Sequence, residues 1–220
     1  DFCLSRGLGD VYKRQLATNS WMQTPVGYEV IDGRYFPKDW FAIVFNPSLP
    51  YRLMHTVSAF YVTTAFVVLA VGAYTVRRGQ WIAEGRMMLR LALWFLAIFV
   101  PLQIFLGDQH GLNTLEHQPA KLAAIEGLWD GGRGVPASII GWPDQAAERN
   151  LAEIAIPRVG SLYLTHSWDG EVKGLKDFPA DQRPPVAIVY FAFRIMVGIG
   201  LLMLAIVAVG LLLMASGRLD

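Results

Sequence analysis

The chain has 220 residues, of which 54% are hydrophobic and 17% charged, with a net charge of +1 and a mean hydropathy of +0.36. Soluble domains carry about 25% charged residues, so this composition indicates a membrane protein. The net charge of +1 argues against a nucleic-acid partner, which would need a basic patch. Cys3 is the single cysteine, so neither a disulfide framework nor a thiolate metal site is expected.

The first 15 residues differ in character from the rest of the chain. They lack the apolar core and small-residue cleavage site of a signal peptide. They are similar to translated sequencing-adapter sequence, and we expect residues 1–15 to be a non-native leader. We also expect the chain to be an internal fragment of a longer protein.

Three long apolar segments follow, at residues 53–76, 87–107 and 186–216. Each reaches the roughly 20 residues that a helix needs to cross a bilayer. We therefore predict an all-α membrane protein with three transmembrane helices and a loop region with short helices, forming part of a larger helical bundle. The predicted organisation is a pre-helix segment (16–52), a helix pair (53–107), a long loop (108–185) and a last helix (186–217).

The basic residues indicate an orientation. Arg77, Arg78 and Arg86 lie in the short connection between the first two apolar segments, and short basic loops stay cytoplasmic. The pre-helix segment and the long loop are therefore expected outside the cytoplasm.

Within the long loop, Pro119 is expected to open a helix over residues 120–129, with Leu122, Ile125 and Trp129 on one face. Asp108 is expected to be a turn or cap residue where the second span ends. The other histidines do not have a compact zinc spacing and are interpreted as loop residues; they are His110, His117 and His166.

His55, Arg194 and Met196 lie inside predicted spans. Ionisable residues such as His55 and Arg194 are costly inside a membrane and usually functional there. Alone, His55 fits a hydrogen-bonded interfacial residue and Met196 a packing residue. Together they provide an imidazole and a thioether, a known axial pair for a low-spin haem. Arg194 then suits a haem propionate, and the alternative is that it reaches the lipid headgroups.

Lys121 and Glu126 lie five residues apart on the predicted loop helix, about 140° around its axis, so they do not form the usual i,i+4 pair. One interpretation is two solvated surface charges. The other is a hydrogen-bond donor and a proton acceptor facing a pocket, as quinol oxidation requires. Position alone leaves both open.

Five sequence blocks, in order, resemble subunit I of the cytochrome bd-type quinol oxidases: residues 21–25 (WMQTP), 54–57 (MHTV), 107–111 (GDQHG), 121–126 (KLAAIE) and 190–200 (YFAFRIMVGIG). The resemblance implies that His55 and Met196 are axial ligands of a low-spin haem b and that Arg194 supports that haem. It also implies that Lys121 and Glu126 belong to the quinol site of the extracytoplasmic Q-loop, and that Asp108 matches an acidic residue near it.

The family's reaction is quinol oxidation at the outer face, with electrons passed to a high-spin haem b and to haem d, or a haem b in its place, where oxygen is reduced. The ligands of those two haems lie outside this sequence, so the chain by itself is not expected to reduce oxygen. The short Q-loop resembles the cyanide-insensitive-type branch.

The resemblance further implies a multi-pass protein of the bacterial cytoplasmic membrane that works with a second oxidase subunit, with or without a small third one. Two alternatives are a membrane cytochrome b that transfers electrons without oxidase activity, and a haem-free transporter or structural subunit. The first would usually need several histidines within spans, and the second usually has broken helices and internal repeats.

Overall fold

The computed structural model describes residues 14–217, in two compact units. The first unit contains residues up to Asn113 and from Leu211 onward, and the second contains Thr114–Gly210. Most of the predicted leader, with Cys3, lies outside the described residues, whereas residues 14–15 begin a helical stretch that runs to residue 23.

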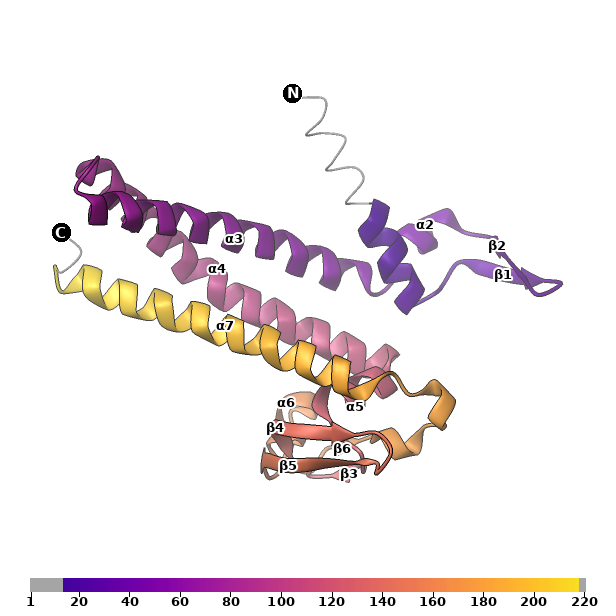
Figure 1. Ribbon diagram of the computed structural model, residues 1–220. Helices are drawn as coiled ribbons and strands as arrows, with labels where there is room; N and C mark the ends of the chain where they lie inside the picture. The colour runs from indigo at the N-terminus through magenta and orange to yellow at the C-terminus, as the bar shows by residue number, and fades with distance from the viewer. Residues whose placement is uncertain (1–13, 218–220) are drawn as a thin grey trace. The chain divides into compact units, whose positions relative to one another are not determined.

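Three small elements follow that stretch in the first unit (Figure 1). Strands β1 (Tyr28–Ile31) and β2 (Arg34–Pro37) form an antiparallel hairpin, and α2 (Trp40–Val44) follows it. The Asp39 carboxylate caps α2 by accepting hydrogen bonds from the amides of the second and third residues beyond it. The sequence analysis did not predict this hairpin.

Helices α3 (Leu49–Arg78) and α4 (Ile82–His117) form the predicted helix pair. Gly79, with φ of 70°, ends α3 in the left-handed conformation that glycine adopts without strain. The buried residues of each helix repeat at helical spacing and give each helix one packed face; on α3 they include Ser58, Val62, Ala65 and Gly72, and on α4 Gly85, Leu89, Ala92, Leu93, Leu96 and Val100.

The second helix of the pair is longer than predicted. It continues through Gly107 and Gly111 to His117, so the turn expected at Asp108 is wrong, and His110 and His117 are helical rather than loop residues. One tertiary contact anchors this extension, because the buried Ser48 hydroxyl donates to Asn113 Oδ1 at 3.0 Å. A glycine in a helix costs only about 1 kcal/mol, which such packing can offset.

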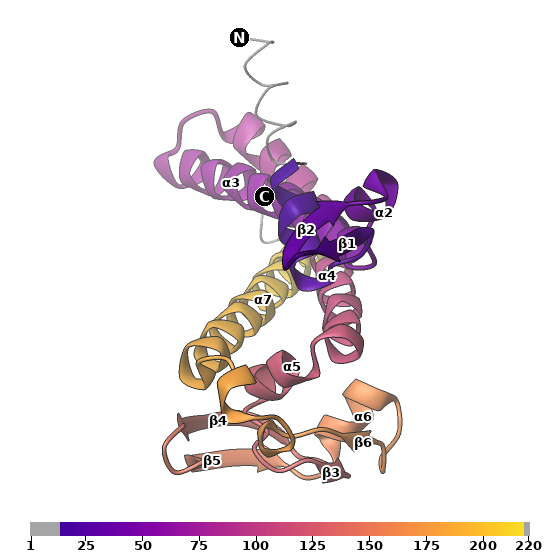
Figure 2. The same ribbon diagram turned by 90° about the vertical axis from the view of Figure 1, so that its right-hand side faces the viewer.

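The second unit combines short helices with two two-stranded sheets (Figure 2). After the end of α4, its elements in order are α5 (Pro119–Glu126), β3 (Gly132–Arg133), β4 (Ala137–Asp144), β5 (Arg149–Ile156), α6 (Val159–Thr165), β6 (Glu171–Val172), the 3-10 turns η1 (Leu175–Asp177) and η2 (Ala180–Gln182), and α7 (Val186–Ala215). Strand β4 pairs with β5 and β3 with β6, both antiparallel. The predicted short helices are present, whereas the strands were not predicted.

Helix α5 lies between two small hydrophobic clusters. Leu122 packs with Leu128, Val135, Leu164 and Val172, whereas Ala123 and Ala124 pack with Trp129, Leu175 and Val186. The helix ends at Glu126, three residues earlier than predicted, because Gly127 takes a left-handed conformation with φ of 67°. Trp129 is therefore outside the helix, and the face predicted for Leu122, Ile125 and Trp129 does not exist.

Three helices are long and apolar enough to cross a membrane: α3, α4 and the segment from Ala180 to Ala215 that contains α7. This confirms the three predicted spans and the mostly helical membrane fold. Many apolar side chains of these helices are exposed within the chain, as expected for surfaces that face lipid or other transmembrane helices.

Substitution of Gly85 by alanine is predicted to weaken the packing of α3 against α4. A Cβ at Gly85 would overlap the Thr75 hydroxyl and approach Val76 Cγ2 to 2.8 Å, whereas a Cβ at Gly200 would meet no atom within 4 Å. We expect Gly85→Ala to cost about 1–3 kcal/mol and to lower the thermal denaturation midpoint in detergent. Gly200→Ala is the matched control and should leave the midpoint close to that of the parent; equal midpoints for both variants would contradict the prediction.

Candidate functional site

Glu126 is the last residue of α5, and its position follows from the packing of that helix. Pro119 starts the helix, and Leu122, Ala123 and Ala124 are buried on either side of it. Glu126 itself is only 7% exposed, which is unusual for a carboxylate without a charged partner. The interpretation of Glu126 as a solvated surface charge is therefore wrong.

Arg194 on α7 is that partner. Its Nη2 lies 3.3 Å from Glu126 Oε2 and 3.4 Å from the Glu126 carbonyl oxygen. The two side chains are 18% and 8% exposed, so water screens this ion pair far less than a surface pair. Within the described second unit, the predicted haem-supporting arginine and the predicted quinol-site carboxylate are thus joined directly.

Tyr190 supports the guanidinium from one turn earlier on α7. The Arg194 Cζ lies 4.5 Å from the centre of the fully buried Tyr190 ring, in a cation–π contact. The Tyr190 hydroxyl shares a hydrogen bond of 2.9 Å with Ser138 on β4. The same ring packs against Gly127, where an added Cβ would approach it to 2.8 Å.

Tyr163 on α6 lies near this carboxylate and packs against the cluster that contains Leu122 and Leu128. Burial, and then the nearby Glu126 charge, raise the pKa of Tyr163 well above the usual value for tyrosine. The phenol therefore stays protonated. The sequence analysis did not predict a residue here, because a single tyrosine in the long loop has no characteristic spacing.

A pocket of about 270 Å³ lies beside Glu126 in the second unit. It is lined by Glu126, Gly127, Leu128, Trp129, Asp130, Pro136, Ser138, Arg149, Asn150 and Glu153. Asn150 braces its wall: its Nδ2 donates to the Gly127 carbonyl oxygen at 2.8 Å, and its Oδ1 accepts from Trp129 Nε1 at 2.8 Å. The pocket therefore borders the buried carboxylate.

The other two residues predicted near this site are more exposed. Lys121 lies on α5, about one and a half turns before Glu126, with a partly exposed side chain. Asp108 is exposed on α4, where Gln109 Nε2 donates to its carboxylate at 3.4 Å.

His55 belongs to the first unit, on the second turn of α3. Gln103 Nε2 lies 3.1 Å from its Nε2 and 3.3 Å from its Nδ1. The backbone of Gly107 lies beside the same ring, since an added Cβ there would be 3.2 Å from His55 Cε1. Gln103 and Gly107, both on α4, were not predicted as part of a site.

Met196 belongs to the second unit, on α7, and is 51% exposed within this chain. One further observation in the second unit fits a haem propionate. The buried Arg194 Nε has no hydrogen-bond partner among the described residues, and a propionate is a natural acceptor for it.

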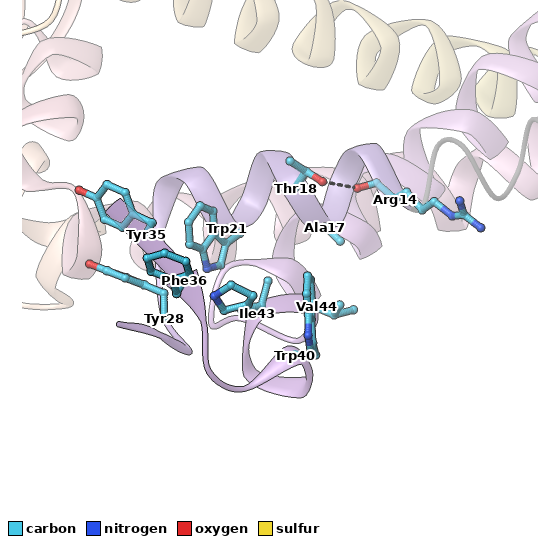
Figure 3. Close-up of a pocket in the computed structure, with 11 residues that line it drawn as sticks. Arg14, Ala17, Thr18, Trp21, Tyr28, Tyr35, Phe36, Trp40, Ile43 and Val44 are labelled. Atoms are coloured by element: carbon cyan, nitrogen blue, oxygen red, sulfur yellow. Dashed lines mark hydrogen bonds between the residues drawn. The ribbon is translucent and has the colours of Figure 1, made fainter. Parts of the chain in front are cut away.

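A larger pocket, of about 510 Å³, lies in the first unit (Figure 3). Aromatic side chains of the pre-helix segment dominate its lining, which includes Trp21, Tyr28, Tyr35, Phe36 and Trp40. None of the six predicted site residues lines it, so its size does not make it the functional site.

Comparison with known proteins identifies the family. The model of the family described as cytochrome bd terminal oxidase subunit I matches residues 15–219. The putative cytochrome bd menaquinol oxidase subunit I of Bacillus subtilis is 34% identical over 191 residues, which cover 85% of this chain and 43% of that protein. Subunit 1 of the Escherichia coli cytochrome bd-II ubiquinol oxidase is 36% identical over 177 residues, covering 77% of this chain and 34% of its own length.

A solved structure agrees with this assignment. The bd oxidase from Geobacillus thermodenitrificans superposes with a TM-score of 0.81 at 30% sequence identity, covering 88% of this chain and 44% of that one. The chain thus spans less than half the length of these relatives. With a family match over nearly its whole length, the chain belongs to the cytochrome bd terminal oxidase subunit I family.

Proposed function

We propose that this chain supplies the electron-entry part of a quinol-oxidising terminal oxidase of the bacterial cytoplasmic membrane, with its Q-loop (108–185) on the extracytoplasmic side. The observation that carries the proposal is the buried pair of Glu126 and Arg194. This pair joins Glu126, the proposed proton acceptor, to an arginine two residues before the candidate haem ligand Met196. Quinol oxidation releases protons and electrons together. It therefore needs a proton acceptor, here Glu126, close to an electron acceptor, here the haem that Met196 is proposed to bind.

In the proposed reaction, a quinol loses two electrons and two protons to become a quinone. Lys121 donates a hydrogen bond to a quinol oxygen, and Glu126 accepts a proton from a quinol hydroxyl through the adjoining pocket. Asp108 contributes negative charge near this region. Arg194 orients the Glu126 carboxylate before the proton arrives.

We further propose that His55 and Met196 are the axial ligands of a low-spin haem b and that Arg194 also binds one of its propionates. When bound, this haem would supply one-electron transfer from the quinol. The imidazole and thioether form a suitable donor set, and the unpartnered Arg194 Nε provides a donor for a propionate. A high-spin haem b, the haem d or haem b of the oxygen site, a second subunit and a small third subunit would complete the enzyme.

Family membership favours this function over the two alternatives, an electron-transferring cytochrome b without oxidase activity and a haem-free transporter or structural subunit.

Removal of either proposed axial ligand is predicted to change the haem spectrum of the assembled oxidase. We expect His55→Ala and Met196→Leu each to abolish the low-spin haem b band or convert it to a high-spin band, because an iron without its sixth ligand changes spin state. Reduced-minus-oxidised absorbance spectra measure this, and immunoblots of membrane fractions check insertion. The matched control is Met203→Leu, which replaces another methionine of α7 and should leave the spectrum unchanged. Unaltered low-spin bands in His55→Ala and Met196→Leu would refute the ligand assignment.

Removal of the Glu126 carboxylate is predicted to separate quinol oxidation from oxygen reduction. We expect Glu126→Ala to lower quinol-dependent oxygen uptake by about 100-fold or more, since a positioned proton acceptor contributes that much, and to spare uptake driven by artificial electron donors. The control is Glu116→Ala, which removes an exposed carboxylate from the last turn of α4. Equal loss of both activities in Glu126→Ala would count against a quinol-site role.

A further inference from the structure

The β4–β5 hairpin of the second unit has two chemically different faces. Residues that pair across an antiparallel sheet lie on the same face, and Ile140 pairs with Ile154 and Trp142 with Leu151. Ile140 and Trp142 are two residues apart on β4, so both pairs lie on one side of the sheet. The four side chains are between 40% and 64% exposed. They form one apolar surface, which we call the outer face of the hairpin.

The opposite face holds the hairpin on the rest of the unit. Ser138 shares a hydrogen bond of 2.9 Å with the Tyr190 hydroxyl on α7, and Asn150 Nδ2 donates to the Gly127 carbonyl oxygen at 2.8 Å. Ser138 and Asn150 also line the pocket beside Glu126. Because these bonds fix the polar face against α5 and α7, the outer face is turned away from the interior of the unit.

Trp142 connects the outer face to the surface of α7. Its ring lies edge-on to that of Phe191, with 5.0 Å between the ring centres. Ile188 and Ile195 lie three residues before and four residues after Phe191, on the same side of the helix, and both are strongly exposed. Figures 1 and 2 both show β4 beside the beginning of α7. The outer face is therefore continuous with an exposed apolar stripe of a membrane-spanning helix.

The length of α7 indicates the depth of this contact. Its 30 residues make a helix about 45 Å long, which matches a bilayer of about 40–45 Å with its headgroup layers included. Phe191 is five residues beyond the first residue of α7, or about 8 Å along the axis. This position is where the headgroups meet the hydrocarbon, and tryptophan side chains are enriched in that layer.

We propose that the outer face of the β4–β5 hairpin lies in the interfacial layer of the lipid bilayer and anchors the second unit to the membrane surface. Contiguous exposed apolar surface of this kind marks a membrane or protein contact, and its continuity with the exposed stripe of α7 selects the membrane. The proposal goes beyond the proposed function, because it depends on the position of a span and on no property of Glu126.

The backbone of the hairpin limits how deep it can lie. The sheet has two strands, so within the described residues each strand has one edge with no strand beside it. Strand edges of this kind are not tolerated in the hydrocarbon core, where water cannot satisfy their amides and carbonyl groups. In the interfacial layer water is present, while apolar side chains still leave it. The same anchor holds the pocket beside Glu126 at the level of the bilayer surface.

The test measures what surrounds a nitroxide attached at Ile154→Cys in the assembled oxidase in lipid nanodiscs, with other reactive cysteines replaced. Power-saturation electron paramagnetic resonance gives its collision rates with oxygen, which concentrates in lipid, and with a polar nickel chelate, which stays in water. We expect the oxygen-to-nickel ratio to be several-fold higher than at Asp169→Cys. This control labels an exposed, charged residue in the turn after α6.

Two results would overturn the proposal. Low collision rates with both reagents would mean that protein covers the outer face, either another part of the subunit or a second subunit. A ratio equal to that of Asp169→Cys would mean that the face is in water. Haem absorbance bands like those of the parent show that the labelled oxidase is assembled. If Ile154→Cys does not assemble, Leu151→Cys on the same face carries the same measurement. Neither readout depends on quinol oxidation, so the outcome is separate from that of Glu126→Ala.

Discussion

The second unit is organised around one buried ion pair, Glu126 with Arg194. A carboxylate that is almost fully removed from water is stable only with compensating charge and hydrogen bonds, and removal of one partner from such a pair costs about 3–5 kcal/mol. The surrounding elements meet this requirement. Helix α5 ends at the carboxylate, the Tyr190 ring makes a cation–π contact with the guanidinium, and Ser138 on β4 is hydrogen-bonded to Tyr190. The loop fold and the candidate site are therefore stabilised by the same contacts.

Features that depend only on residues close together in the sequence could be predicted. The three spans follow from length and hydropathy, and α5 follows from Pro119 and its buried residues. Arg194 stood out because a charge inside an apolar segment is costly. The pairing of Arg194 with Glu126 could not be predicted, since 68 residues separate them and only the folded loop brings them together.

Features that depend on tertiary contacts were missed or misplaced. Strands β4 and β5 alternate weakly and expose apolar side chains such as Ile140 and Ile154, so no clean period of two marks them. Helix α4 passes through two glycines because a contact from Ser48 secures its far end. Helix α5 stops where Gly127 takes a left-handed conformation, and this glycine packs so closely on the Tyr190 ring that a Cβ would approach it to 2.8 Å. Each outcome was decided by a partner distant in sequence.

The end of α5 at the left-handed Gly127 also limits which insertions and deletions the helix can tolerate. Each residue added or removed within α5 would turn Glu126 by about 100° around the helix axis and direct it away from Arg194. Insertions and deletions between Pro119 and Gly127 should therefore be selected against much more strongly than substitutions. The turn after α6, where Trp168 is exposed, does not set the direction of a site residue around a helix axis. Insertions and deletions should therefore be tolerated better there.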